Sequence, residues 1–146
     1  MRKIFTVVLI FILASLSACR NPSSVPRMEE YPWTLSSVQS ADKNGKVIAY
    51  GSAAISPWPD AIFVELECTA ADGKLTVTNL PKGEDVSGTY AVSQISPDSI
   101  IYDVTLGNRS GKAVVAMTTY HDQTQTPTLI FNLDDIILNF FAVQKG

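Results

Sequence analysis

The sequence predicts an all-β domain, and three observations lead to that prediction. After residue 31, short runs rich in valine, isoleucine, threonine and aromatic residues recur at the spacing of about 8–12 residues that sandwiches and barrels show. Glycine, proline, asparagine and aspartate separate the runs. No segment in this part shows a sustained helical periodicity between capping residues. The connections are short, so neighbouring runs are expected to pair as antiparallel hairpins.

Nine runs are expected to form strands, and the chain supplies a break after most of them. Asn44-Gly45 favours a tight hairpin because both residues accept a positive φ. Pro57 and Pro59 end the second run, since proline has no N–H to donate to a ladder. The expected strands are residues 33–39, 47–55, 61–69, 75–78, 86–94, 99–106, 112–120, 128–133 and 136–143.

Residues 129–143 are the one stretch that also fits a helix. At period two, Ile136, Leu138 and Phe140 share a face, whereas at period 3.6 Ile136 aligns with Phe140 and Val143. Isoleucine and phenylalanine favour strands, and Asp134-Asp135 is suited to a hairpin turn, so two strands are predicted.

About eight such strands in up-and-down order are expected to close into an antiparallel barrel, because closure removes the exposed edges that promote aggregation. The run at 61–69 alternates cleanly. Its inward face would carry Ile62, Val64, Leu66 and Cys68.

The first nineteen residues are of a different kind. Arg2 and Lys3 precede an apolar run at residues 4–18, which is shorter than the roughly 20 residues needed to cross a bilayer. A charged start, an apolar middle and small residues at the end are typical of an export signal. The closing Leu16-Ser17-Ala18-Cys19 resembles the lipobox of bacterial lipoproteins. This resemblance implies that residues 1–18 are removed and that Cys19 carries diacylglycerol and an N-acyl chain such as palmitate.

Three parts follow from this division. A lipoprotein signal peptide at residues 1–18 precedes the lipidated cysteine and a flexible tether, rich in proline and serine, at residues 19–30. Residues 31–146 form the β-barrel domain, which is long enough to bury a core without disulfides. The mature protein is expected to be lipid-anchored in the cell membrane or the outer membrane, facing outside the cytoplasm.

Within the domain, three segments resemble the lipocalin-like (calycin) domains of bacterial lipoproteins. They are residues 33–38 (WTLSSV), residues 88–92 (GTYAV) and the closing hairpin with residues 129–131 and 138–141. The resemblance implies a barrel in which the early tryptophan, Trp33, plugs one end.

Charge narrows the choice of partners. Arg2 and Lys3 leave with the signal, so the 11 basic residues become 9 against 14 acidic ones, a net charge of −5. No basic block remains, and nucleic acid is not an expected partner.

The chain shows no assembled catalytic set, and an enzyme is not expected. His121 lies in a polar loop, and Glu65 and Glu67 alternate with apolar residues as the solvent face of a strand. Cys68 is expected to be a buried core thiol, because after lipidation it has no cysteine to pair with. No cofactor and no metal site are expected.

Trp58, between Pro57 and Pro59, cannot join a central strand. Either its ring lies at a barrel mouth as a lid or contact, or it folds back to cap the core. Trp33, Trp58 and Tyr90 are the candidate contact residues for a ligand or partner.

Together these points indicate a monomeric, non-enzymatic lipoprotein that binds a small hydrophobic ligand or a cell-envelope component in or at the mouth of its barrel. An eight-stranded barrel is just wide enough to be filled by side chains or to hold one small ligand. The alternative is a protein-interaction module such as an inhibitor of a secreted enzyme. Residues 72–77 and 87–90 resemble parts of membrane-bound lysozyme inhibitors.

Overall fold

A computed structural model describes residues 24–42, 44–51, 54 and 59–144, and every structural statement below concerns these residues. They form one short 3₁₀ helix and nine strands. These elements are η1 (Met28–Glu30), β1 (Trp33–Ser40), β2 (Val47–Tyr50), β3 (Leu66–Ala71), β4 (Lys74–Asn79), β5 (Glu84–Ile95), β6 (Ser99–Leu106), β7 (Arg109–Thr119), β8 (Gln125–Leu133) and β9 (Ile136–Ala142).

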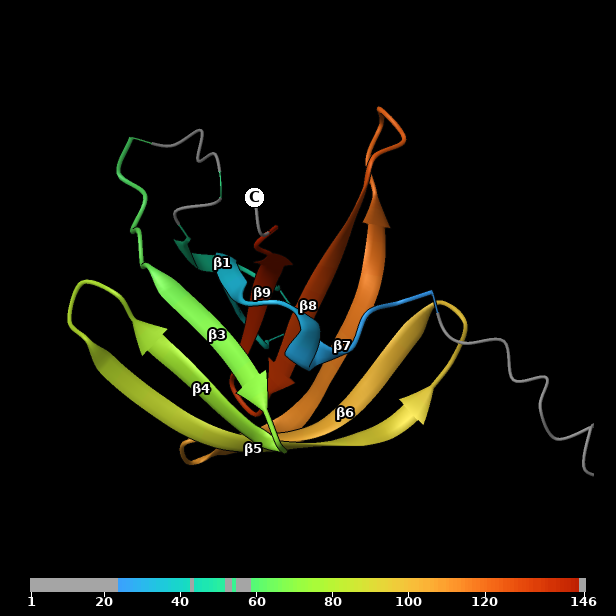
Figure 1. Ribbon diagram of the computed structural model, residues 1–146. Helices are drawn as coiled ribbons and strands as arrows, with labels where there is room; N and C mark the ends of the chain where they lie inside the picture. The colour runs from blue at the N-terminus through green and yellow to red at the C-terminus, as the bar shows by residue number, and fades with distance from the viewer. Residues whose placement is uncertain (1–23, 43, 52–53, 55–58, 145–146) are drawn as a thin grey trace, which may run out of the picture.

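Eight of the strands close into an antiparallel up-and-down barrel (Figure 1). From β3 to β9 each strand pairs with the next one along the chain, and β1 closes the barrel by pairing with both β3 and β9. β2 is an additional strand beside β1. The all-β barrel expected from the sequence is therefore confirmed.

One edge of β1 is shared between two partners. Trp33 pairs with Cys68 of β3, whereas further along Ser37 pairs with Tyr50 of β2. The chain re-enters the sheet at Phe63 through a parallel bridge to Tyr50. The strand expected at 61–69 therefore begins only at Leu66, because the residues before it bond to β2 instead of extending β3.

Residues 129–143 form two strands and no helix, as predicted. β8 begins earlier than expected, at Gln125, and includes Pro127. Pro127 lies opposite Met117 of β7, while the pairing of β8 with β9 begins at Thr128. Proline is tolerated there because this part of β8 has a neighbour on one side only.

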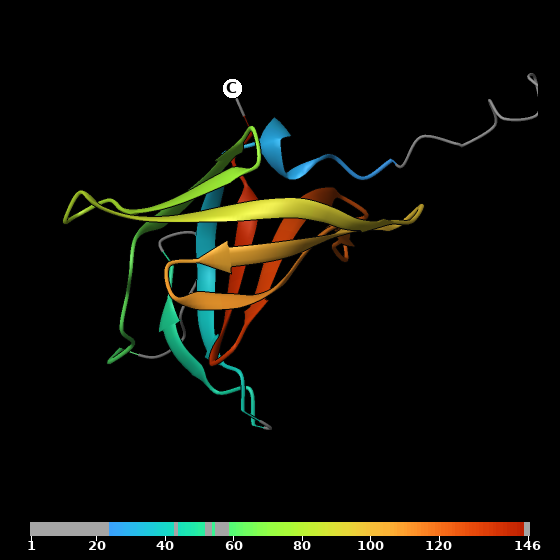
Figure 2. The same cartoon turned by 90° about the horizontal axis from the view of Figure 1, so that it is seen from below.

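The barrel has two distinct ends (Figure 2). The end at which β1 begins, with the β3–β4, β5–β6 and β7–β8 connections, is called the proximal end here. The opposite end, with the β4–β5, β6–β7 and β8–β9 turns, is the distal end. Residues 24–30, called the N-terminal segment here, lie with the β5–β6 turn on the right of Figure 2, and the β4–β5 turn lies on the left.

A flexible tether was expected over residues 19–30, and the structure corrects this expectation for residues 24–30, while residues 19–23 lie outside the described part of the chain. Val25 is 5 % exposed and Met28 is fully buried, so both belong to the barrel core. The turn of η1 is closed by the Glu30 N–H, which donates to the Arg27 carbonyl, and by the Arg27 N–H, which donates to the Glu30 carboxylate at 2.8 Å. The polar composition of the segment did not predict this burial, because two apolar side chains are enough to anchor a polar segment to the core.

Candidate functional site

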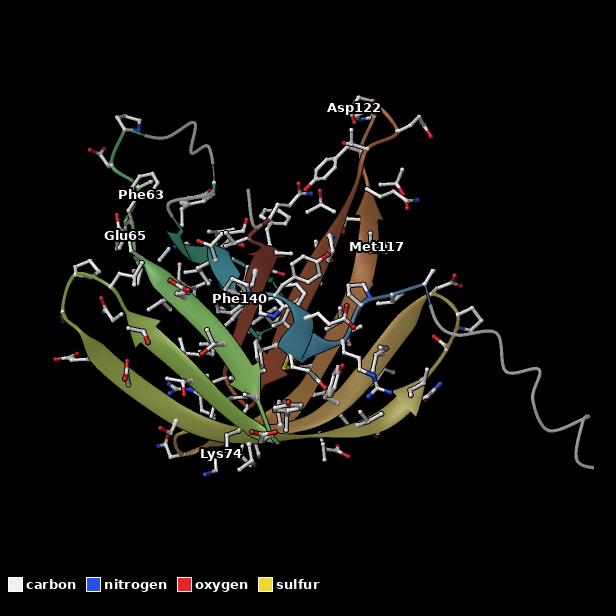
Figure 3. All side chains as sticks on the ribbon, in the orientation of Figure 1. Phe63, Glu65, Lys74, Met117, Asp122 and Phe140 are labelled. Atoms are coloured by element: carbon white, nitrogen blue, oxygen red, sulfur yellow. The ribbon has the colours of Figure 1, made fainter. Side chains whose placement is uncertain are left out.

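Side chains fill the interior of the barrel. Every strand from β3 to β9 except β5 contributes buried apolar residues, and Phe140 lies near the middle of the structure in Figure 3. The rings of Phe131 and Phe140 meet edge to face with centroids 5.8 Å apart. The largest fully buried side chains are Trp33, Tyr102, Phe131, Phe140, Met28, Leu35, Leu75, Ile100, Leu129, Val115 and Cys68.

The proximal end is closed by η1, which lies across it in Figure 1. The Met28 N–H donates a 3.1 Å hydrogen bond to the hydroxyl of Tyr102, and the Trp33 indole N–H donates a 2.8 Å bond to the Met28 carbonyl. Both bonds are buried, where an unpaired polar group would cost about 1–3 kcal/mol. Met28 is therefore held by packing and by both of its backbone polar groups.

Trp33, a candidate contact residue, is instead a core residue. Its exposed fraction is zero, and its ring meets that of Tyr31 edge to face with centroids 6.0 Å apart. A ring without exposed surface cannot meet a partner from solution, so the contact role expected for Trp33 is corrected. Trp58 and Cys19, the predicted lipidation site, lie outside the described residues.

Tyr90, the third candidate contact residue, is half-buried at the proximal end. Its ring meets Tyr102 edge to face at a centroid distance of 5.8 Å. Burial raises the pKa of its hydroxyl, and the nearby Glu29 carboxylate acts in the same direction. Tyr90 thus lies beside the N-terminal segment and forms part of the surface on which this segment packs.

The residues considered for catalysis do not come together. His121 is exposed in the β7–β8 connection, and its neighbour Asp122 accepts bonds from the N–H and the hydroxyl of Thr124 at 3.0 and 2.6 Å. Asp135 pairs with Arg109 at 2.6 Å across the distal end. His121 and Asp135 therefore lie at opposite ends of the barrel and do not form a catalytic pair.

Cys68 is a buried core thiol, as predicted, since its exposed fraction is zero. Burial raises the pKa of this thiol to about 12. The reactive thiolate is thus scarce at neutral pH.

Two surface hollows could not be predicted from the sequence, because their shape depends on how the sheet curves. One, of about 530 Å³, lies over β5, β6 and β7 and is lined by Thr89, Tyr90, Ala91, Asp103, Val104, Thr105, Ser110 and Gly111. The Thr89 and Thr105 hydroxyls bond there at 2.8 Å, and Asp103 pairs with Lys112. The other, of about 310 Å³, lies beside the N-terminal segment and is lined by Ser24, Val25, Pro26, Glu30, Tyr31, Met117 and Pro127.

Within the described part of the chain, no group of three or more metal-ligating side chains is present, and no helix is long and apolar enough to span a membrane. Comparison with models of protein families, with curated proteins and with solved structures finds no match for this chain.

Proposed function

We propose that the mature protein is a non-enzymatic, lipid-anchored binding module that faces outside the cytoplasm and engages a cell-envelope component with the rim of its barrel. The anchor is the lipid on Cys19, which the Leu16-Ser17-Ala18-Cys19 motif supports. The observation that carries the binding mode is the filled interior. With Trp33, Phe131 and Phe140 packed across the barrel, binding falls to its outer surface and rims.

The exposed apolar residues favour a protein surface as the component that is bound. At and near the distal end, Ile62, Phe63, Leu80 and Val86 are each about half exposed or more. Apolar side chains surrounded by charged ones are typical of the centre of a protein interface. A net charge of −5 for the mature chain favours a basic partner. The same charge also suits the alternative function, which is inhibition of a secreted basic enzyme such as lysozyme.

Lipidation is tested by following the precursor in cells. Globomycin, which blocks lipoprotein signal peptidase, and Cys19→Ala should each leave an unprocessed precursor. The mature form should begin at residue 19 and carry acyl chains by mass spectrometry. A mature protein that begins at another residue would refute the anchor.

The binding mode is tested by native mass spectrometry of the mature chain released from its acyl chains. After incubation with a fatty acid, the measured mass should still be that of the chain without a ligand, because side chains occupy the described interior of the barrel. A retained one-to-one complex would show that an apolar ligand enters the barrel and would contradict binding at the rim. A lysozyme inhibition assay tests the named protein partner directly.

A further inference from the structure

The segment that would connect the barrel to a lipid on Cys19 begins at the proximal end. Ser24, the first described residue, is exposed, and the next residues are fixed by the burial of Val25 and Met28. η1 packs against β3, and the segment before it runs beside the β5–β6 turn in both views (Figures 1 and 2). The direction in which the chain leaves the barrel is therefore set by the core.

The distance from this point to a lipidated Cys19 is short. Four residues lie between Cys19 and Ser24, and the five Cα-to-Cα steps from Cys19 to Ser24 span at most about 18 Å when fully extended. A long linker would let the barrel take any orientation. This one holds the proximal end close to the bilayer.

The same end exposes apolar side chains at the tips of three strands. Ile95 ends β5 and is 52 % exposed, Tyr120 follows β7 and is 41 % exposed, and Val143 follows β9 and is 39 % exposed. Tyrosine and aliphatic side chains at a loop tip are suited to the interface between headgroups and acyl chains. The β7–β8 hairpin projects beyond the other strands, with Asp122 at its tip (Figure 3).

Charge selects the kind of lipid surface. Glu29, Glu30, Asp72, Asp98 and Asp122 lie at the proximal end, whereas Arg27 and Lys74 are the basic residues described there. An excess of carboxylates is repelled by anionic headgroups and tolerated by zwitterionic ones. The fitting surface is therefore a zwitterionic phospholipid bilayer.

We infer that the proximal rim, with Ile95, Tyr120 and Val143, rests on the zwitterionic phospholipid surface of the membrane in which Cys19 is anchored, so that the distal end points away from it. This inference rests on the proposed lipidation of Cys19 and adds to it a fixed orientation. The exposed distal residues Phe63 and Leu80 are then the ones presented to a partner.

The test uses the full lipidated protein in vesicles of phosphatidylcholine and phosphatidylethanolamine. Ile95→Cys and Leu80→Cys are labelled with an environment-sensitive fluorophore. The two positions form a matched pair, because both side chains are 52 % exposed and they lie at opposite ends of the barrel. Cys68 is buried and would remain unlabelled, and the lipid occupies the thiol of Cys19.

On vesicles, the label at position 95 should shift to the blue and be quenched several-fold less by aqueous iodide than the label at position 80. Nitroxide-labelled lipid should quench position 95 preferentially. Without vesicles, iodide should quench both labels alike. Equal iodide quenching on vesicles, in a protein that floats with them, would overturn the orientation and leave the lipid anchor standing. If the mature protein proved to carry no acyl chains and did not float with the vesicles, both the anchor and the orientation would be overturned.

Discussion

The indole N–H of Trp33 donates a 2.8 Å hydrogen bond to the carbonyl oxygen of Met28, five residues earlier in the chain. This bond joins the first strand of the barrel to the segment that closes its proximal end. Because both residues are fully buried, the N-terminal segment is part of the folded domain.

Trp33→Phe should lower the free energy of unfolding by about 2–4 kcal/mol, because it leaves the Met28 carbonyl unpaired and removes buried ring volume. Urea denaturation followed by far-ultraviolet circular dichroism measures this loss. Tyr120→Phe, at an exposed ring, serves as the control and should change stability by less than about 0.5 kcal/mol. Equal stability of the two variants would show that the bond and the ring contribute nothing.

Met28→Ala should lower the free energy of unfolding by about 2–5 kcal/mol, as expected when a buried methionine leaves a cavity. Hydrogen exchange at the N–H groups of residues 25–30 should become faster than at the strands, because the segment loses its main anchor. Leu80→Ala, at a half-exposed side chain, is the matched control. If residues 24–30 were an independent tether, Met28→Ala would behave like this control.

The thiol of Cys68 should make stability depend on pH above about 9. Burial raises its pKa from 9.0 to about 12, so between these values the unfolded chain loses a proton that the folded chain keeps. Stability is fully present below pH 9 and should fall by up to about 1.4 kcal/mol per pH unit as the pH rises through this window.

Urea denaturation from pH about 8 to pH about 10 measures this slope. Burial also raises the pKa values of Tyr90 and Tyr102, which begin to ionise in the unfolded chain towards pH 10, so the Cys68 contribution is the difference between the wild-type chain and Cys68→Ala. Cys68→Ala should show a flatter dependence, since it has no thiol to ionise. A slope that is the same in both chains would mean that Cys68 ionises as readily when folded as when unfolded. Iodoacetamide should leave Cys68 unlabelled in the folded wild-type chain and should label it once denaturant has unfolded the chain.

Gly88→Ala should destabilise the barrel by more than about 3 kcal/mol, or prevent folding. A Cβ at this position would lie 1.9 Å from the carbonyl oxygen of Thr105 on the neighbouring strand, far closer than van der Waals contact allows, so the backbone would have to move. Gly83→Ala is the control: its Cβ meets nothing within 4 Å, and its φ of +62° costs about 1–2 kcal/mol. Thermal unfolding of both variants compares crowding with backbone strain.

The order of the strands from β3 to β9 could be predicted because it depends on local patterns. Alternating apolar residues, the Asn44-Gly45 turn and the Asp134-Asp135 turn all lie within a few residues of the strands they limit. The ends of strands were harder to predict. β3 begins at Leu66 because residues 62–64 find hydrogen-bond partners in Tyr50, and no local signal announces such a partner.

The candidate site was less accessible to sequence reasoning. Trp33 was expected both to plug the barrel and to contact a ligand, and its complete burial leaves only the first role. Met28 gave no signal, because one methionine in a polar stretch resembles any exposed linker residue. Its role depends on Tyr102, 74 residues away, whose hydroxyl accepts the Met28 N–H.

The sequence by itself determined the strand class and the up-and-down order from β3 to β9, since these follow from periodicity and turn residues that are local in the chain. It also predicts an export segment from a local apolar run. The tertiary structure alone decided that β1 joins β3 and β9, that side chains fill the interior and that residues 25–30 close the proximal end. These features depend on contacts between residues far apart in sequence, and such contacts arise only when the sheet has curved enough to bring its first and last strands together.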